Sequence, residues 1–241
     1  FGVNKTYCGD SARMLARLDY IKQRPAAILD AGSGTGNALA ALGERYPGAR
    51  IVALDIALAM LMRGRERIPW WKGLLTPRPH AVCGDIEQLP LVDASIGMVW
   101  SNLTLQWVNE PQRAFAEVRR VLSAGGLLMF STFGPDTLKE LRRAYQGADR
   151  YTHVNRFIDM HDIGDMLLES GFADPVMDME CITLTYGDVR QLMRELKAIG
   201  AHNVTRGRPA GLSGKSLLAT VARNYEAFRR DGKLPATFEV V

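Results

Sequence analysis

The stretch that decides the fold is Ala26-Ala27-Ile28-Leu29-Asp30-Ala31-Gly32-Ser33-Gly34-Thr35-Gly36. Its first half is a short apolar run that predicts a buried β-strand, and its second half is a glycine-rich loop that predicts a tight turn into a helix. Glycine has no Cβ, so a loop of this kind lets a ligand approach the backbone closely. The stretch therefore predicts a strand, a ligand-binding loop and a helix in succession.

The spacing of the glycines distinguishes between classes of nucleotide-binding loop. A dinucleotide-binding loop has the pattern G-x-G-x-x-G, whereas here Gly36 comes one residue early and Asn37 stands in the place of the third glycine. A P-loop is also excluded, because no Gly-Lys-Ser/Thr follows at the required distance. The spacing favours a nucleoside without phosphates, the alternative being a turn that only lets strand and helix pack.

Similar apolar runs recur along the chain at residues 51–55, 81–85, 97–100 and 127–131, and helical patterns lie between them. One such pattern covers residues 112–122 and is expected to stop at Gly125-Gly126. This alternation predicts an α/β fold with a doubly wound, mostly parallel sheet.

The later part of the chain has a different pattern. Residues 176–186 predict a late strand, residues 200–215 an inserted cap, and residues 217–230 a helix before a last strand that pairs antiparallel with the late one. We expect a single domain over residues 1–241, with a cofactor-binding core (20–135), a substrate cap and late strand (136–215), and a closing helix and strand (216–241).

Polar side chains follow the first four predicted strands at the point where each strand ends. In open sheets of this kind the ligand binds beyond the carboxyl ends of the strands. An aspartate that ends the second strand can accept hydrogen bonds from both ribose hydroxyls, although it can also cap a helix. An aspartate that ends the third strand can accept a hydrogen bond from the amino group of adenine. The predicted cofactor-binding residues are Asp30, Gly32, Ser33, Gly34, Gly36, Asp55, Ile56, Met60, Asp85, Ile86 and Asn102. Met60 is also expected in the core, with Met14 and Met62.

Composition limits the remaining possibilities. The net charge of +4 is too small for a dedicated nucleic-acid-binding protein, and the chain shows neither a membrane-spanning run nor an export signal. Three widely spaced cysteines match no disulfide framework, and neither they nor the four histidines have zinc-ligand spacing, so we expect a cytoplasmic protein without a metal.

Residues 26–133 resemble the class I S-adenosylmethionine-dependent methyltransferases. More restrictive stretches, at residues 101–109, 133–142, 159–165, 196–201 and 211–215, resemble the malonyl-acyl-carrier-protein O-methyltransferases of biotin synthesis. The resemblance implies transfer of a methyl group from S-adenosylmethionine, which becomes S-adenosylhomocysteine, to the free carboxylate of a malonyl thioester. The thioester would be carried by acyl carrier protein or coenzyme A, and the methyl ester would prime pimeloyl synthesis.

A malonyl carboxylate is ionised at neutral pH, so the reaction needs no general base and no catalytic acid or base residue is expected. A guanidinium can orient a carboxylate through two hydrogen bonds. The candidates are Arg142, Arg143 and Arg156, of which we favour Arg156, with a surface arginine as the alternative.

The carrier protein that the family implies is acidic. A basic face to match it could be formed by Arg142, Arg143, Arg206, Arg208, Lys215, Arg223, Arg229 and Arg230. The family carries an aromatic-acidic pair of residues on an N-terminal helix, and the stretch Tyr7-Cys8-Gly9-Asp10 does not match it, so we assign no role to Tyr7.

Two other functions share the same motifs. Related respiratory-complex assembly factors carry the stretches at 105–109 and around Phe133, and an arginine-hydroxylating or assembly function is therefore an alternative, as is methyl transfer to another small carboxylate. A non-catalytic binding module on the same fold is the third possibility.

Overall fold

A computed structural model describes residues 2–67, 79–149, 151, 153–198 and 215–241. The chain divides into two compact units, which we describe separately. One unit comprises residues 7–132 and 161–177, and the other comprises residues 1–6, 133–160 and 178–241.

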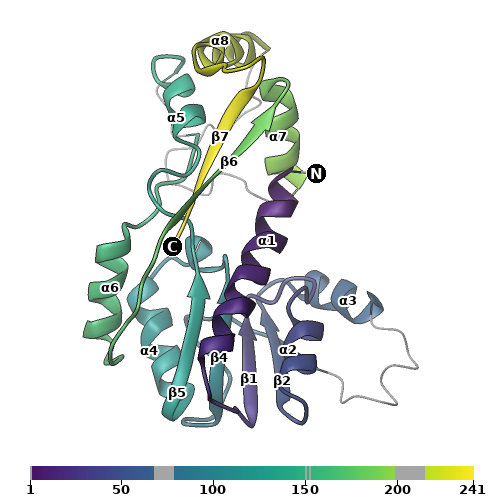
Figure 1. Cartoon of the computed structure of the whole chain (residues 1–241), viewed down its shortest axis with the longest axis vertical. Coiled ribbons are helices and arrows are strands. Elements are labelled where there is room, and N and C mark those ends of the chain that lie inside the picture. Colours follow the sequence, from purple (N-terminus) through teal and green to yellow (C-terminus); the bar gives the residue numbers. More distant parts are fainter. Residues whose placement is uncertain (1, 68–78, 150, 152, 199–214) are drawn as a thin grey trace. The chain divides into compact units, whose positions relative to one another are not determined.

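The first unit is built on a five-stranded sheet (Figure 1). Its strands are β1 (Ala27–Ala31), β2 (Arg50–Asp55), β3 (His80–Cys83), β4 (Ile96–Asn102) and β5 (Leu122–Ser131). The order is β3-β2-β1-β4-β5, and every neighbouring pair is parallel. The chain winds outward first through β2 and β3 and then through β4 and β5, so the strand order reverses between β1 and β4. Ligands of such sheets bind at this position.

Helices cover both faces of this sheet because the side chains of each strand alternate between the faces. Ile28 and Met98 lie in one core with helices α1 (Gly2–Arg17) and α2 (Leu39–Arg45). Leu29 and Val99 lie in the other core with α4 (Pro111–Val121). The remaining elements of this unit are η1 (Leu18–Tyr20), α3 (Leu58–Arg67), η3 (Leu105–Trp107) and most of α6 (Met160–Glu169).

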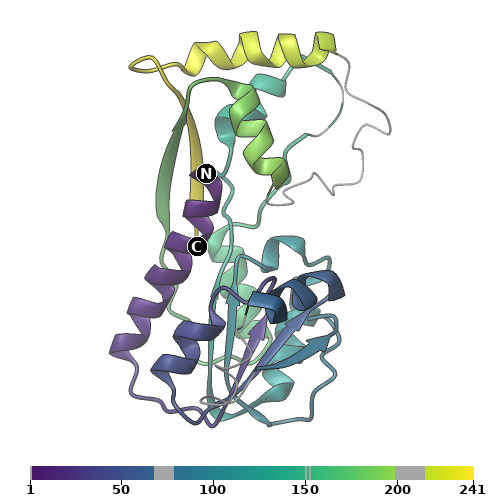
Figure 2. The same ribbon diagram turned by 90° about the vertical axis from the view of Figure 1, so that its right-hand side faces the viewer.

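The second unit contains a two-stranded antiparallel sheet of β6 (Glu180–Tyr186) and β7 (Leu234–Val240). Its helices are α5 (Lys139–Tyr145), α7 (Val189–Ala198) and α8 (Lys215–Tyr225), which Figure 1 labels and Figure 2 shows from the side. The short helix η4 (Glu226–Phe228) follows α8. The buried carboxylate of Glu140 fastens α5 to β7, because it accepts hydrogen bonds from the backbone N–H of Thr237 at 3.0 Å and from its hydroxyl at 2.5 Å.

The structure confirms the α/β doubly wound fold and the antiparallel pairing of the late and last strands. That pair forms a sheet of its own rather than extending the parallel one. The expected helix stop at Gly125-Gly126 is wrong: α4 ends at Val121, and both glycines lie inside β5. Among the described residues, no helix is both long and apolar enough to cross a membrane.

Candidate functional site

The glycine loop between β1 and α2 is held in place by the end of β2. The backbone N–H groups of Gly32 and Ser33 both donate to the carbonyl oxygen of Leu54, at 2.8 and 2.9 Å. The Asp55 carboxylate accepts from Gly34 N at 2.8 Å and from Ala57 N at 2.8 Å. Asp55 therefore fixes the loop and caps the start of the next helical turn, in addition to any ribose contact.

Gly32 is required in this loop for two reasons. Its φ of 77° lies in the left-handed region, which residues other than glycine rarely adopt. A Cβ at this position would also overlap the side chain of Thr104, whose hydroxyl donates to the carbonyl oxygen of Ala31 at 3.2 Å. The loop conformation thus depends on the close approach of the chain segment that follows β4.

The residues around the loop fit a nucleoside cofactor such as S-adenosylmethionine. The hydroxyl of Ser33 is buried and has no hydrogen-bond partner among the described residues, so it is available to a ligand. A Cβ on Gly34 would come no closer than 4.0 Å to another atom, the Cε of Met60, which leaves the loop open on that side. Ile56 is 71% exposed and Met60 38% exposed, and together they offer apolar surface of the kind that an adenosine covers.

This exposure corrects one expectation. Met60 and Met62 were expected in the core, but both are exposed, whereas Met14 is buried as predicted. The helix α3 turns these two side chains outward, where Met60 borders the glycine loop. Its predicted place among the cofactor-binding residues remains a prediction.

Two further predicted residues stand at the end of β3. Asp85 is exposed, and its carboxylate accepts from Glu87 N at 2.9 Å, so one oxygen serves the local turn. Ile86 beside it is half-buried. An exposed carboxylate next to an apolar side chain suits the amino edge and the face of an adenine ring, and the role of these two residues in cofactor binding remains a prediction.

Asp30 at the end of β1 differs from the other carboxylates because it is only 3% exposed. Burial, and to a smaller extent the negative charge of Asp55, raise its pKa to about 7. Removing a carboxylate from water disfavours its charged form. Asp30 therefore changes charge near neutral pH, and a cationic ligand at the loop would favour the ionised form.

Asn102 at the end of β4 belongs to a polar cluster that sequence reasoning largely missed. The hydroxyl of Ser131, which ends β5, donates to the Asp10 carboxylate at 2.5 Å, and its oxygen lies 2.9 Å from the side-chain oxygen of Asn102. Leu103 N donates to Ser131 Oγ at 3.2 Å, and Leu103 has a positive φ of 51°. Asn102 had been predicted, but Ser131 and Asp10 had not.

The three candidate arginines all lie in the second unit, and they differ from one another. Arg142 donates to the carbonyl oxygens of Pro135 at 2.8 Å and Thr137 at 3.0 Å, and its Nε is buried without a partner among the described residues. Burial lowers the pKa of Arg142, the negative charge of Asp136 raises it by less, and the positive charge of Arg156 lowers it by less still. Arg142 thus braces the turn before α5, while Arg156 and Arg143 are exposed.

The structure describes only some of the basic residues that we predicted to contact a carrier protein. Arg223 and Arg230 are exposed, whereas Arg229 is held by Glu226 at 2.6 Å and by the carbonyl oxygen of Gly232 at 2.6 Å. The side chains of Arg206, Arg208 and Lys215 lie outside the described part of the chain. Within the described residues, no group of three His, Cys, Asp or Glu side chains could hold a metal ion.

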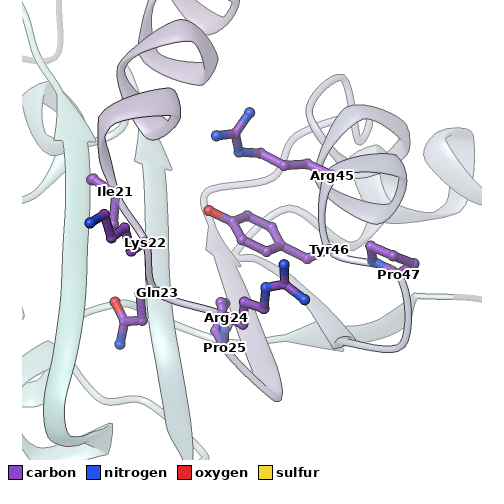
Figure 3. Close-up of a pocket in the computed structure, with 8 residues that line it drawn as sticks. All are labelled: Ile21, Lys22, Gln23, Arg24, Pro25, Arg45, Tyr46 and Pro47. Atoms are coloured by element: carbon purple, nitrogen blue, oxygen red, sulfur yellow. The ribbon is translucent and has the colours of Figure 1, made fainter.

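A cavity of about 560 Å³ lies at the opposite end of β1 from the glycine loop (Figure 3). It is lined by residues before β1 and at the end of α2, namely Ile21, Lys22, Gln23, Arg24, Pro25, Arg45, Tyr46 and Pro47. Gln23, one of the lining residues, donates to the carbonyl oxygen of Gly125 at 2.9 Å. Because ligands of such sheets bind at the carboxyl ends of the strands, we place the functional site at the glycine loop and not in this cavity.

Comparisons with known proteins show to which family the chain belongs. The family described as "Methyltransferase domain" matches residues 29–130. A malonyl-[acyl-carrier protein] O-methyltransferase of Gallionella capsiferriformans is 59% identical over 230 residues, covering 95% of this chain and 79% of the relative. A relative of the same name from Nitrosospira multiformis is 59% identical over 240 residues, covering 95% and 78%. The solved YcgJ protein of Bacillus subtilis shares the fold, with a TM-score of 0.64, 15% identity and 95% of each chain covered.

A parallel sheet of this order, with a glycine loop after β1 and polar strand ends, defines a class I methyltransferase that uses S-adenosylmethionine. The predicted class is thereby confirmed. The high identity to curated relatives over nearly the whole chain shows which family within this class the chain belongs to. The chain belongs to the family of malonyl-[acyl-carrier protein] O-methyltransferases.

Proposed function

We propose that this protein transfers the methyl group of S-adenosylmethionine to the free carboxylate of a malonyl group carried by acyl carrier protein. The observation that carries the proposal is the name shared by relatives that are 59% identical over 95% of the chain. The product is a methyl ester, and the chemistry suits the priming step of pimeloyl and biotin synthesis. The reaction belongs in the cytoplasm, and malonyl coenzyme A is a second acceptor.

The cofactor would be held by the residues of the glycine loop and the strand ends. Bound S-adenosylmethionine supplies an electrophilic methyl group on a positively charged sulfur. Gly32, Ser33 and Gly34 offer backbone surface to it, Asp55 receives the ribose hydroxyls, and Asp85 with Ile86 receives the adenine. Asp30, Gly36, Ile56, Met60 and Asn102 complete the proposed cofactor set.

The protein's contribution to the chemistry is to orient the two reactants and exclude water. The acceptor carboxylate is already ionised, so no side chain has to remove a proton. Holding the acceptor oxygen in line with the methyl–sulfur bond converts an encounter into an intramolecular step. A dry site strengthens this effect, because transfer neutralises the sulfonium charge.

Arg156 is the residue that we propose to orient the malonyl carboxylate. It is exposed and therefore free to receive a ligand, whereas Arg142 is engaged with two backbone carbonyl groups. Arg156 and Arg142 are close enough for the charge of Arg156 to lower the pKa of Arg142, and the carboxylate of Asp136 lies near Arg142 as well. In this proposal Arg142 holds the backbone before α5 in place and does not bind the carboxylate itself. Arg143 is the weakest of the three candidates for binding the carboxylate.

Replacement of Arg156 by alanine tests this role. We expect kcat/KM for malonyl-acyl carrier protein to fall about 10-fold to 100-fold, the range of a charged hydrogen-bonded pair, with unchanged affinity for S-adenosylmethionine. Arg156→Lys should restore only part of the activity, because lysine cannot form the two-point contact. Arg143→Ala, at another exposed arginine of the same unit, is the control. Equal kcat/KM for Arg156→Ala and wild type would remove Arg156 from the proposal.

A further inference from the structure

His153 belongs to the second unit, and its side chain is only 8% exposed. Its Nε2 lies 2.9 Å from Oδ1 and 2.8 Å from Oδ2 of Asp149, four residues earlier. The same carboxylate accepts a hydrogen bond of 2.9 Å from the backbone N–H of Tyr151. Asp149 therefore holds both the backbone and the imidazole ring of the segment that follows α5.

The imidazole ring of His153 also stacks on Tyr145, the last residue of α5. The two ring centroids lie 4.0 Å apart, and the ring planes differ by 12°. Contacts between aromatic rings stabilise beyond the area that they bury, and they do so only in particular orientations. The stack and the pair with Asp149 together fix the direction in which the chain leaves α5.

The helix α5 offers His153 a firm surface because it is held to two other elements of the same unit. Glu140 near its start accepts a hydrogen bond of 3.0 Å from the backbone N–H of Thr237 on β7. Ala144 near its end accepts one of 2.9 Å from the side-chain amide of Asn224 on α8. A ring that packs on this helix is thus tied to the framework of the unit.

Arg156 lies three residues beyond His153 and directly before a second aromatic contact. Phe157 meets the ring of Phe133 edge-on, with centroids 5.7 Å apart and planes at 69°. Val154, between the two contacts, is 6% exposed. The chain on both sides of Arg156 is therefore held by packed side chains, whereas Arg156 itself is exposed. An arginine that orients a substrate needs such support, because a misplacement of about 1 Å can cost about 100-fold in rate.

We infer that His153 is a positioning residue: stacked on Tyr145 and paired with Asp149, it holds the chain segment that presents Arg156 to the malonyl carboxylate. This inference rests on the proposed function, and in particular on the role of Arg156. His153 does not bind the substrate itself, because its side chain is almost fully covered. It raises the fraction of protein molecules in which Arg156 stands ready for the acceptor. The competing interpretation is that His153 only stabilises the fold.

A double-mutant cycle between His153 and Arg156 tests the inference, with kcat/KM for malonyl-acyl carrier protein as the readout. His153→Ala should lower kcat/KM about 3-fold to 30-fold, less than Arg156→Ala does, because the guanidinium is kept but is in place less often. The loss should be a rise in KM more than a fall in kcat, since bound substrate itself holds Arg156. In the Arg156→Ala background, His153→Ala should change kcat/KM by less than about 2-fold, because the two residues act as one unit.

Three further measurements separate positioning from general stability. His153→Phe keeps a ring that can stack on Tyr145 but loses the pair with Asp149, so its kcat/KM should lie between those of wild type and His153→Ala. His80→Ala removes an exposed histidine at the start of β3, in the other unit, and should leave kcat/KM unchanged. Calorimetry should show the same affinity for S-adenosylhomocysteine in wild type and His153→Ala. If melting temperatures show that His153→Ala fails to fold, Asp149→Asn takes its place in the cycle.

The inference would be overturned if the losses from His153→Ala and Arg156→Ala multiplied in full, because a lower folded fraction acts independently of Arg156. Unchanged kcat/KM in His153→Ala would also overturn it, as would weaker binding of S-adenosylhomocysteine. If Arg156→Ala were as active as wild type, the inference would fall with the role of Arg156, while methyl transfer by wild type would still support the proposed reaction. A wild-type protein that binds S-adenosylhomocysteine but does not methylate malonyl-acyl carrier protein would refute both.

Discussion

Replacing Asp30 by asparagine should make the stability of this protein much less dependent on pH. The side chain is buried at the end of β1, and burial together with the charge of Asp55 raises its pKa from 3.8 to about 7. In the unfolded chain the carboxylate is solvated and its pKa is near 3.9. The folded protein therefore holds one proton more than the unfolded chain between these two pH values.

The sign and size of the effect follow from this difference. Unfolding free energy falls as pH rises wherever the folded state holds more protons, by about 1.4 kcal/mol per pH unit for one proton. The contribution of Asp30 is fully present below about pH 4, declines up to about pH 7 and is lost above it. Across that window the loss amounts to about 4 kcal/mol.

Urea denaturation of wild type and Asp30→Asn at several pH values between about 4 and about 8 measures this loss. The stability of the variant relative to wild type should increase by about 4 kcal/mol over the range, because asparagine cannot ionise. Asp19→Asn, at an exposed position, provides the matched loss of a carboxylate. If the unfolding free energies of wild type and Asp30→Asn changed in parallel with pH, the argument that Asp30 is buried and ionises near pH 7 at the end of β1 would be refuted.

Three further predictions concern the cofactor, the loop and the carrier. Binding of cationic S-adenosylmethionine near pH 7 should release part of a proton from Asp30, seen by calorimetry in two buffers of different ionisation enthalpy; equal heats would contradict it. Gly32→Ala should destabilise the protein by about 2–5 kcal/mol and abolish cofactor binding, because the left-handed φ and the overlap with Thr104 act together. Denaturation and calorimetry measure both effects, and near-wild-type values would contradict the loop geometry. Combined Arg223→Glu and Arg230→Glu should slow transfer to malonyl-acyl carrier protein more than to malonyl coenzyme A, as steady-state kinetics would show, and equal slowing would exclude these residues from carrier docking.

The strands and the glycine loop were predictable because each depends on local sequence. A buried parallel strand is a short apolar run, and a loop that needs left-handed backbone is marked by its glycines. The rule that strand ends face the ligand identified Asp30, Asp55, Asp85 and Asn102. Applied to the fifth strand, the same rule would also have found Ser131.

Other features depend on packing between distant segments, and the sequence alone did not show them. Asp10 lies on a helix, so no strand-end rule applies to it, and its contact with Ser131 spans 121 positions of the chain. Met62 was misplaced because an apolar side chain on a short helix can face either the core or the solvent. The glycine pair at 125–126 resembled a helix stop, but β5 begins immediately after α4 and includes both residues.

The central claim is methyl transfer to a malonyl carboxylate, and its most direct test uses mass spectrometry. The protein is incubated with S-adenosylmethionine and malonyl-acyl carrier protein, and the acyl group is then analysed. Our account predicts that the malonyl group gains the mass of one methylene and that acetyl-acyl carrier protein, which has no free carboxylate, gains nothing. An unchanged malonyl group, in the presence of a protein that binds the cofactor, would contradict the account.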